Sequence, residues 1–269
     1  MQLEVKNLTA GYGDTKIIEN LNLTIPEGKV TALIGANGCG KSTLLKTICR
    51  IIPFMGGEVL LDGKRIDSYD TRQLAKQMAI LPQNPTAPGE LTVRELVMYG
   101  RAPHQGKLFA RSTKEDKEIV EWALKETDLL EFADRGINNM SGGQRQRAWI
   151  AMAIAQNTDI LFLDEPTSFL DVSHQMDVLH LVEHLNKKYN KTIIMVIHEL
   201  NEAARFADYL VAMKKGCIMY EGTPHEIFHN DMLMDVFGID SHIMNDPRTN
   251  RPFCIPYSVK AINHDVGEV

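Results

Sequence analysis

The feature that most constrains this chain is a glycine-rich loop between an apolar run and an amphipathic run. The loop follows the apolar residues 30–34, opens the run 44–52, and matches the pattern G-x-x-x-x-G-K-[ST]. A strand, a glycine loop and a helix in this order turn backbone N–H groups and the helix N-terminus toward phosphate oxygens. We therefore predict a nucleotide site at this loop, whose contacting residues are Gly35, Asn37, Gly38, Cys39, Gly40, Lys41, Ser42 and Thr43.

Two further motifs fit phosphate chemistry. Ser141-Gly142-Gly143-Gln144 precedes the apolar run 148–155, and the apolar run 160–163 ends in Asp164 and Glu165. In the glycine loop, Lys41 can reach the β- and γ-phosphates and Ser42 can hold Mg²⁺. An acidic pair at a strand end suits an aspartate near Mg²⁺ and a glutamate near an attacking water.

Together with Gln83 after a strand and His198 after the run 192–197, these motifs resemble the ATP-binding subunits of ABC transporters. The resemblance covers residues 1 to about 225, with all motifs in order. It implies an α/β fold in which a P-loop NTPase (RecA-like) core carries an antiparallel β subdomain and an inserted helical subdomain. It also implies ATPase activity with ATP and Mg²⁺ as the bound groups.

The resemblance implies roles for individual residues. Asp164 would hold Mg²⁺ together with Ser42 and Gln83, and Glu165 would polarise the attacking water. Gln83 and His198 would sense the γ-phosphate, with Lys41 on the phosphates. Tyr12 lies where family members stack an aromatic ring on adenine, which needs no base-specific contact.

The signature Ser141 to Gln144 poses a geometric problem, because it ends the inserted subdomain, away from the glycine loop of the same chain. In a two-fold dimer each site would combine Lys41 of one copy with Ser141 and Gly143 of the other. Asp171 matches the family's loop across that interface, and it also suits the N-cap of a helix starting at Val172. We therefore expect a second copy of the chain as a partner.

The apolar patterns predict the order of elements. Strands are expected at 3–9, 17–25, 58–61, 78–81, 192–197, 209–213 and 217–220, and the first two should pair antiparallel. Residues 92–157 read as helical, with a capping box at Ser112 and Glu115, and residues 172–189 form a further helix. We place the ATP-binding domain at 1–225, its helical insertion at about 90–157, and an appendage at 226–269. A short helix should run from Thr223 to near His229, followed by extended chain.

Composition excludes several classes of protein. The net charge of −6 disfavours a nucleic-acid binder, so we expect no nucleic-acid partner. The four cysteines contain no C-x-x-C pair, which disfavours a zinc or disulfide framework. The N-terminus lacks the pattern of a secretion signal, and no apolar run reaches the length of a membrane helix. We therefore expect the protein to lie at the cytoplasmic face of the cell membrane, where integral permease subunits would hold it.

The cargo is suggested by resemblance alone. The segments 100–106, 221–228, 236–240 and 246–252 resemble the importer branch for ferric siderophores, haem and cobalamin, with the ferric-siderophore members closest. This branch implies an extracytoplasmic substrate-binding protein as a further partner. Alternatives are a haem or cobalamin importer, a non-transport ABC ATPase, and a P-loop kinase. The short gap between Gln83 and Ser141 disfavours the arm-bearing non-transport class, and a kinase has no use for the signature.

Overall fold

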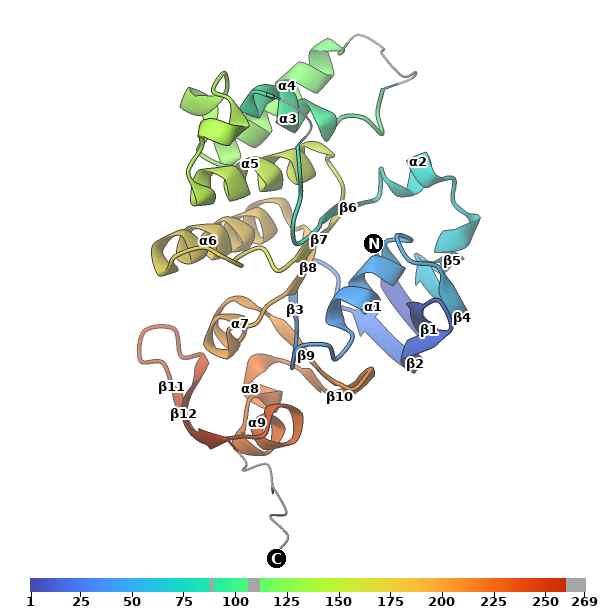
Figure 1. Cartoon of the computed structure of the whole chain (residues 1–269), viewed down its shortest axis with the longest axis vertical. Helices are drawn as coiled ribbons and strands as arrows, with labels where there is room; N and C mark the ends of the chain where they lie inside the picture. The colour runs from blue at the N-terminus through green and yellow to red at the C-terminus, as the bar shows by residue number, and fades with distance from the viewer. Residues whose placement is uncertain (88–89, 106–111, 260–269) are drawn as a thin grey trace, which may run out of the picture.

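The main sheet lies at the centre of the molecule (Figure 1). The structure, a computed structural model, describes residues 1–87, 90–105 and 112–259. The main sheet has the strand order β10-β9-β3-β8-β7-β6, and its neighbours pair in parallel except for β10, which runs antiparallel to β9. Its strands are β3 (Val30–Gly35), β6 (Met78–Leu81), β7 (Ile160–Asp164), β8 (Thr192–Val196), β9 (Tyr209–Lys214) and β10 (Cys217–Gly222).

The sequence of the central strands explains why they form a parallel sheet. Every residue of β3, β7 and β8 is buried, as expected for strands covered on both faces. Strand β8 lies between β3 and β7, so the carboxyl ends of β3 and β7 reach the same edge of the sheet. This topology brings the glycine loop and Asp164 to one edge, where open α/β sheets bind their ligands.

A second, antiparallel sheet covers one face of the first. It has the order β2-β1-β4-β5, formed by β1 (Leu3–Tyr12), β2 (Thr15–Ile25), β4 (Phe54–Leu61) and β5 (Lys64–Arg65). The predicted antiparallel pairing of the first two strands is confirmed. Side chains of β3 alternate between two cores: Leu33 packs with this sheet, while Ala32 and Ile34 pack on the opposite face.

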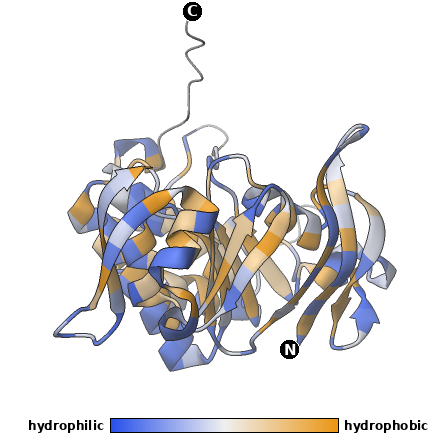
Figure 2. Ribbon diagram, turned by 90° about the horizontal axis from the view of Figure 1, so that it is seen from below, coloured by the Kyte–Doolittle hydropathy of each residue, from blue (hydrophilic) through white to orange (hydrophobic). Residues whose placement is uncertain are grey.

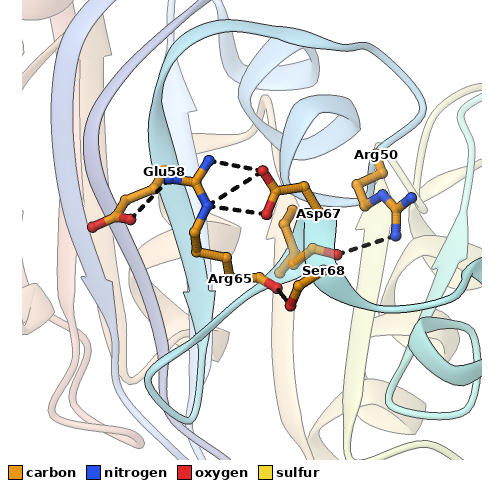
Figure 3. Close-up of polar contacts among 6 residues, drawn as sticks. Arg50, Glu58, Arg65, Asp67 and Ser68 are labelled. Atoms are coloured by element: carbon orange, nitrogen blue, oxygen red, sulfur yellow. Dashed lines mark hydrogen bonds and ion pairs between the residues drawn. The ribbon is translucent and has the colours of Figure 1, made fainter.

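Helix α1 (Lys41–Ile48), which follows the glycine loop, is fastened to the far end of the second sheet (Figure 3). Nη1 of Arg50 donates hydrogen bonds to the carbonyl oxygens of Ile66 (3.1 Å) and Tyr69 (2.8 Å). The short helix η1 (Ile66–Ser68) follows Arg65, which donates to Asp67 through Nη2 (2.7 Å) and forms an ion pair with Glu58 (3.3 Å). These contacts connect the sheet to the helix after the loop.

Helices occupy the connection between β6 and β7 (Figure 1). They are α3 (Val93–Tyr99), α4 (Lys114–Glu126), η2 (Leu130–Phe132), η3 (Ile137–Asn139) and α5 (Gly142–Ala155), and α2 (Thr71–Leu74) precedes β6. The capping box predicted at Ser112 and Glu115 was wrong by one residue, because Thr113 and Asp116 form it. Asp116 is fixed in this position because Nε of Arg101 donates to it at 2.9 Å in a buried ion pair.

Two further helices follow β7 and β8, and they pack in the core that lies on the face of the main sheet away from the second sheet. Helix α6 (Val172–Tyr189) has the predicted bounds, and it buries an apolar stripe that includes Val178, Leu179, Val182 and Leu185. Helix α7 (Leu200–Phe206) begins two residues after His198 and buries Ala203, Ala204 and Phe206. His198 therefore lies in the short link between a sheet strand and a helix.

The C-terminal segment differs from the expected extended chain. The predicted short helix is α8 (Pro224–Ile227), but a second helix, α9 (Asn230–Phe237), follows it and was not predicted. Met232, Leu233 and Val236 bury the apolar face of α9 against the main core. Strands β11 (Ile239–Asn245) and β12 (Pro252–Val259) then form an antiparallel hairpin, which we call the C-terminal hairpin.

Apolar residues concentrate on the strands of the central sheet and on the helix faces packed against it (Figure 2). In the part of the chain that the structure describes, no helix combines the length and apolar character needed to span a membrane.

Candidate nucleotide site

The glycine loop forms a pocket of about 260 Å³ at the carboxyl edge of β3. Gly40, with φ of 107°, is the N-cap of α1, a backbone conformation that favours glycine. The loop thereby turns directly into α1, whose first N–H groups have no partner within the helix. The pocket is lined by Tyr12, Ile17, Asn37, Gly38, Cys39, Gly40, Lys41, Ser42, Thr43, Glu165 and His198.

Lys41 is held inside this loop. Its side chain is buried, and Nζ donates to the carbonyl oxygens of Gly35 (2.7 Å) and Ala36 (3.1 Å). The Sγ atom of Cys39 lies 3.8 Å from the same Nζ. A buried ammonium without a carboxylate partner is costly to desolvate, and these oxygens satisfy it only in part. The arrangement fits an anion arriving in the pocket beside Lys41.

Ser42 and Asp164 form a pair suited to a cation. Ser42 Oγ donates to Oδ1 of Asp164 at 2.8 Å, whereas Oδ2 of Asp164 is buried and has no hydrogen-bond partner. Lys46 Nζ lies 3.8 Å from that Oδ2. Burial raises the pKa of Asp164, although the Ser42 hydrogen bond and Lys46 oppose this. An orphaned carboxylate oxygen beside a serine hydroxyl fits a hard cation with oxygen ligands.

Glu165 lies at the centre of a hydrogen-bonded cluster. Its Oε1 is 2.6 Å from Nε2 of His198, and its Oε2 accepts from Oγ of Ser168 at 2.8 Å and from Nε2 of Gln83. Burial acts to raise the pKa of Glu165, but the bonds from His198 and Ser168 outweigh it and hold the pKa below its usual range. The carboxylate is therefore ionised at neutral pH and can accept a proton from a water in the pocket.

The signature lies elsewhere on the surface. Ser141 is the N-cap of α5 and exchanges two hydrogen bonds with Gln144 in a capping box. A Cβ on Gly143 would lie 2.0 Å from the ring of His174, whose Nδ1 is 2.8 Å from the Asp171 carboxylate. Neither the signature residues, Gly142 included, nor Asp171 line the pocket of Lys41. Two groups of predicted residues are thus kept apart within one chain.

Sequence reasoning missed four residues of these sites. Lys46 lies on α1 beside Asp164, Ser168 bonds to Glu165, Ile17 lines the pocket, and His174 fills the space over Gly143. Ser168 carried a detectable signal, because it follows Glu165 by three residues in a turn closed by its own N–H. The other three depend on tertiary contacts that local pattern does not encode.

The fold and pocket define the class: this is a P-loop ATP-binding protein with an inserted helical region. The sequence pattern of the family described as ABC transporter matches residues 18–168. The chain belongs to the ABC transporter family, and it is an ATPase of that family.

Similar proteins span nearly the whole chain. It is 54% identical over 257 residues to the iron(3+)-hydroxamate import ATP-binding protein FhuC of Bacillus subtilis (strain 168), covering 96% of this chain and 95% of that protein. It is 46% identical over 255 residues to the ferric enterobactin transport ATP-binding protein FepC of Escherichia coli (strain K12), covering 95% and 94%. Among solved structures, the dimeric bacterial ABC transporter cassette MJ0796 superposes with a TM-score of 0.71 at 31% identity, covering 82% of this chain and 98% of that one.

Proposed function

We propose that this chain powers the import of an iron(III)–siderophore complex through a membrane permease. The observation that carries the proposal is the 54% identity, over nearly the full length of both chains, to a protein named for iron(3+)-hydroxamate import. A second relative is named for ferric enterobactin transport. Two relatives named for different ferric siderophores support the cargo class rather than one siderophore.

Within that function, we assign residues 1–225 to ATP binding and hydrolysis, with the helical insertion at about 90–157. Lys41 and the loop N–H groups would bind the phosphates, and Tyr12 would stack on adenine. Mg²⁺ would be held by Ser42, Asp164 and Gln83, and it would neutralise charge on the phosphates. The buried Oδ2 of Asp164, which has no hydrogen-bond partner, supports this assignment.

Glu165 would act as the general base. Its ionised carboxylate lines the pocket, and Ser168, Gln83 and His198 fix its orientation. It would take a proton from the water that attacks the γ-phosphate, while His198 and Gln83 respond to that phosphate. Three side chains therefore hold the Glu165 carboxylate at the wall of the pocket.

A second copy would complete each site. Ser141 and Gly143 offer an exposed helix N-terminus, a ready anion site, yet they lie outside the pocket of their own chain. A two-fold pairing places Lys41 of one copy opposite Ser141 of the other. The dimeric form of the solved cassette MJ0796 supports this arrangement.

The permease would dock where the core meets the helical region. A groove of about 280 Å³ is lined by residues of the core, including Arg50, Leu74 and Ile80, and by Pro103 and Gln156 of the helical region. An element seated there touches both parts, so a change in their relative position would be transmitted to it. This docking would hold the chain at the cytoplasmic face of the membrane. An extracytoplasmic binding protein would deliver the cargo to the permease.

Labelled-iron uptake in cells lacking this chain tests the cargo. We expect loss of uptake for at least one iron(III)-siderophore complex in a panel, with haem and cobalamin uptake retained. The wild-type gene should restore uptake. Lys41→Ala should not, since it removes the charge that faces the phosphates. Lys114→Ala, at a Lys whose side chain is 92% exposed, is the matched control and should restore it. Normal uptake of every siderophore, with a deficit confined to haem or cobalamin, would overturn the proposed cargo.

A further inference from the structure

The side chain of Asn201 links helix α7 to the C-terminal hairpin through two hydrogen bonds. Its Nδ2 donates to the carbonyl oxygen of Cys254 (3.1 Å), and its Oδ1 accepts from the N–H of Cys254 (2.8 Å). The carboxamide thus pairs with both backbone groups of one residue of β12, as a neighbouring strand would. Figure 1 shows β12 beside α7. Cys254 is buried in the main core, and the two bonds are partly buried.

Asn201 also lies three residues after His198, at the point where the sheet stops fixing the chain. Strand β8 ends at Val196, and the N–H of Ile197 donates the last bond to the sheet, at Leu33. Beyond Ile197, the backbone of His198 is placed by the helix that follows. The position of the first turn of α7 therefore sets how His198 approaches Glu165.

That first turn packs Leu200 and Ala203 on the main core, but no side chain caps its start. Helix α7 has seven residues, too short to be stable on its own, and its N-cap Glu199 forms no side-chain capping bond. Caps normally satisfy the first N–H groups and fix where a helix starts. In α7, the paired bonds of Asn201 to Cys254 hold the first turn from outside the helix.

We propose that Asn201 is a positioning residue for ATP hydrolysis: by docking α7 on the C-terminal hairpin, it holds His198 in contact with Glu165. This gives the hairpin a role in catalysis although it lines no part of the nucleotide pocket. The 2.6 Å contact between His198 and Glu165 needs both partners fixed, and Gln83 and Ser168 fix only Glu165.

The chain offers a matched control. Asn230 on α9 ties the same hairpin at its other strand, where Oδ1 accepts from the N–H (2.9 Å) and Oγ (3.1 Å) of Ser241. Both asparagines therefore hold the hairpin through two hydrogen bonds. Asn201 alone belongs to the helix that follows His198, so the two substitutions separate positioning from general support of the hairpin.

The test is steady-state ATP hydrolysis by the full-length chain. Asn201→Ala should lower kcat by about threefold to tenfold with the KM for ATP unchanged, because a contact used in the transition state is loosened. Asn201→Asp, which keeps the side-chain size but loses the donor to Cys254, should act in the same direction. Asn230→Ala should leave kcat unchanged. Equal losses for Asn201→Ala and Asn230→Ala, or no loss for Asn201→Ala, would overturn the proposal.

A double-variant cycle tests whether Asn201 acts through His198. In single-turnover assays, Asn201→Ala should cause no further loss in the His198→Ala background, since coupled residues are not additive. The same fold-loss in both backgrounds would overturn the proposal. The inference rests on the proposed hydrolysis at the Lys41 pocket. An inactive wild type would defeat that function, whereas an active wild type with a fully active Asn201→Ala would defeat this inference alone.

Discussion

His198 and Glu165 are joined by a 2.6 Å contact between Nε2 and Oε1, although they lie on different strand ends. Glu165 follows β7 and His198 follows β8, and these strands are neighbours in the sheet. Glu165 has φ of 55°, a left-handed conformation that is uncommon for a residue with a side chain. Such backbone strain persists only where the surrounding bonds fix it, and it concentrates at functional sites.

Glu165→Gln removes the proposed base while keeping the size of the side chain. We expect ATP hydrolysis to fall by about 10²- to 10⁴-fold, the usual contribution of a general base. Glu118→Gln, at a Glu whose side chain is 65% exposed, is the matched control and should hydrolyse ATP normally. Phosphate release measures both. Wild-type turnover by Glu165→Gln would exclude Glu165 as the base.

His198→Ala should change how hydrolysis depends on pH. The pKa of Glu165 lies below its usual range. Burial acts to raise this pKa, and the hydrogen bond from His198 is the largest contribution that lowers it. Without His198 the pKa of Glu165 rises, so the carboxylate becomes protonated at a higher pH as the solution is acidified. The acid limb of the kcat profile should therefore move to higher pH. Ser168→Ala should move it in the same direction by less. An acid limb that stays in place or moves to lower pH contradicts this account of the cluster.

Cys39 places a thiol inside the phosphate loop. It is buried with Sγ 3.8 Å from Nζ of Lys41, so a bulky adduct would occupy the space beside that ammonium. The Cys217→Ser background removes an exposed thiol. In this background, alkylation of Cys39 should abolish ATP hydrolysis, and bound ATP should protect Cys39 from alkylation. Cys39→Ser should remain active and resist inactivation. Full activity of the enzyme alkylated at Cys39 would show that the adduct clears the phosphates.

Arg101 and Asp116 form a buried ion pair that holds the start of α4. Arg101 also donates to the carbonyl oxygen of Ala155 at 2.9 Å. Arg101→Ala leaves Asp116 buried and unpaired, and it should lower the free energy of unfolding by about 3–5 kcal/mol. Arg94→Ala removes solvent-exposed ion pairs with Glu121 and Asp134 and should cost about 1 kcal/mol or less. Urea unfolding measures the free energy of unfolding of both variants. Equal decreases would show that the buried ion pair stabilises the chain no more than the exposed ones.

The same pair predicts a pH dependence of stability. Burial raises the pKa of Asp116, but the bonds from Thr113 and Arg101 outweigh it and lower the pKa in the folded chain. The ionised Asp116 therefore stabilises the folded chain above about pH 4, and this stabilisation is lost as the pH falls through the pKa of Asp116 in the folded chain. Arg101→Ala should lose less stability on acidification over this range than the wild type.

The sequence predicted most strands because burial leaves a clear signature in them. Residues 78–81 and 172–189 were bounded correctly, since each is a continuous apolar run or a regular apolar stripe. The capping box at Ser112 failed because Thr113 fits the same pattern, and the buried partner Arg101 selects Asp116. Helix α9 was missed because its eight residues are stabilised by packing against the core.

Prediction of the site had a similar limit. The loop residues named from sequence, from Asn37 to Thr43, line one pocket, because the strand-loop-helix order fixes their neighbourhood, whereas Gly35 does not line it. Lys46 and His174 were missed, since their contacts with Asp164 and Gly143 cross from one element to another. Local pattern specifies the elements and their ends, whereas the topology of the sheet decides which ends meet.

The central claim, that two copies of this chain form the ATP-hydrolysing unit, is tested most directly by the mass of Glu165→Gln in solution. With saturating ATP and Mg²⁺, light scattering should show the mass doubling from 30.3 kDa, because ATP is trapped between Lys41 of one copy and Ser141 of the other. With ADP the mass should stay at 30.3 kDa. Adding Ser141→Arg should prevent doubling, although Ser141 lies outside the pocket of its own chain. A mass that stays at 30.3 kDa with ATP, or that doubles despite Ser141→Arg, would contradict the account.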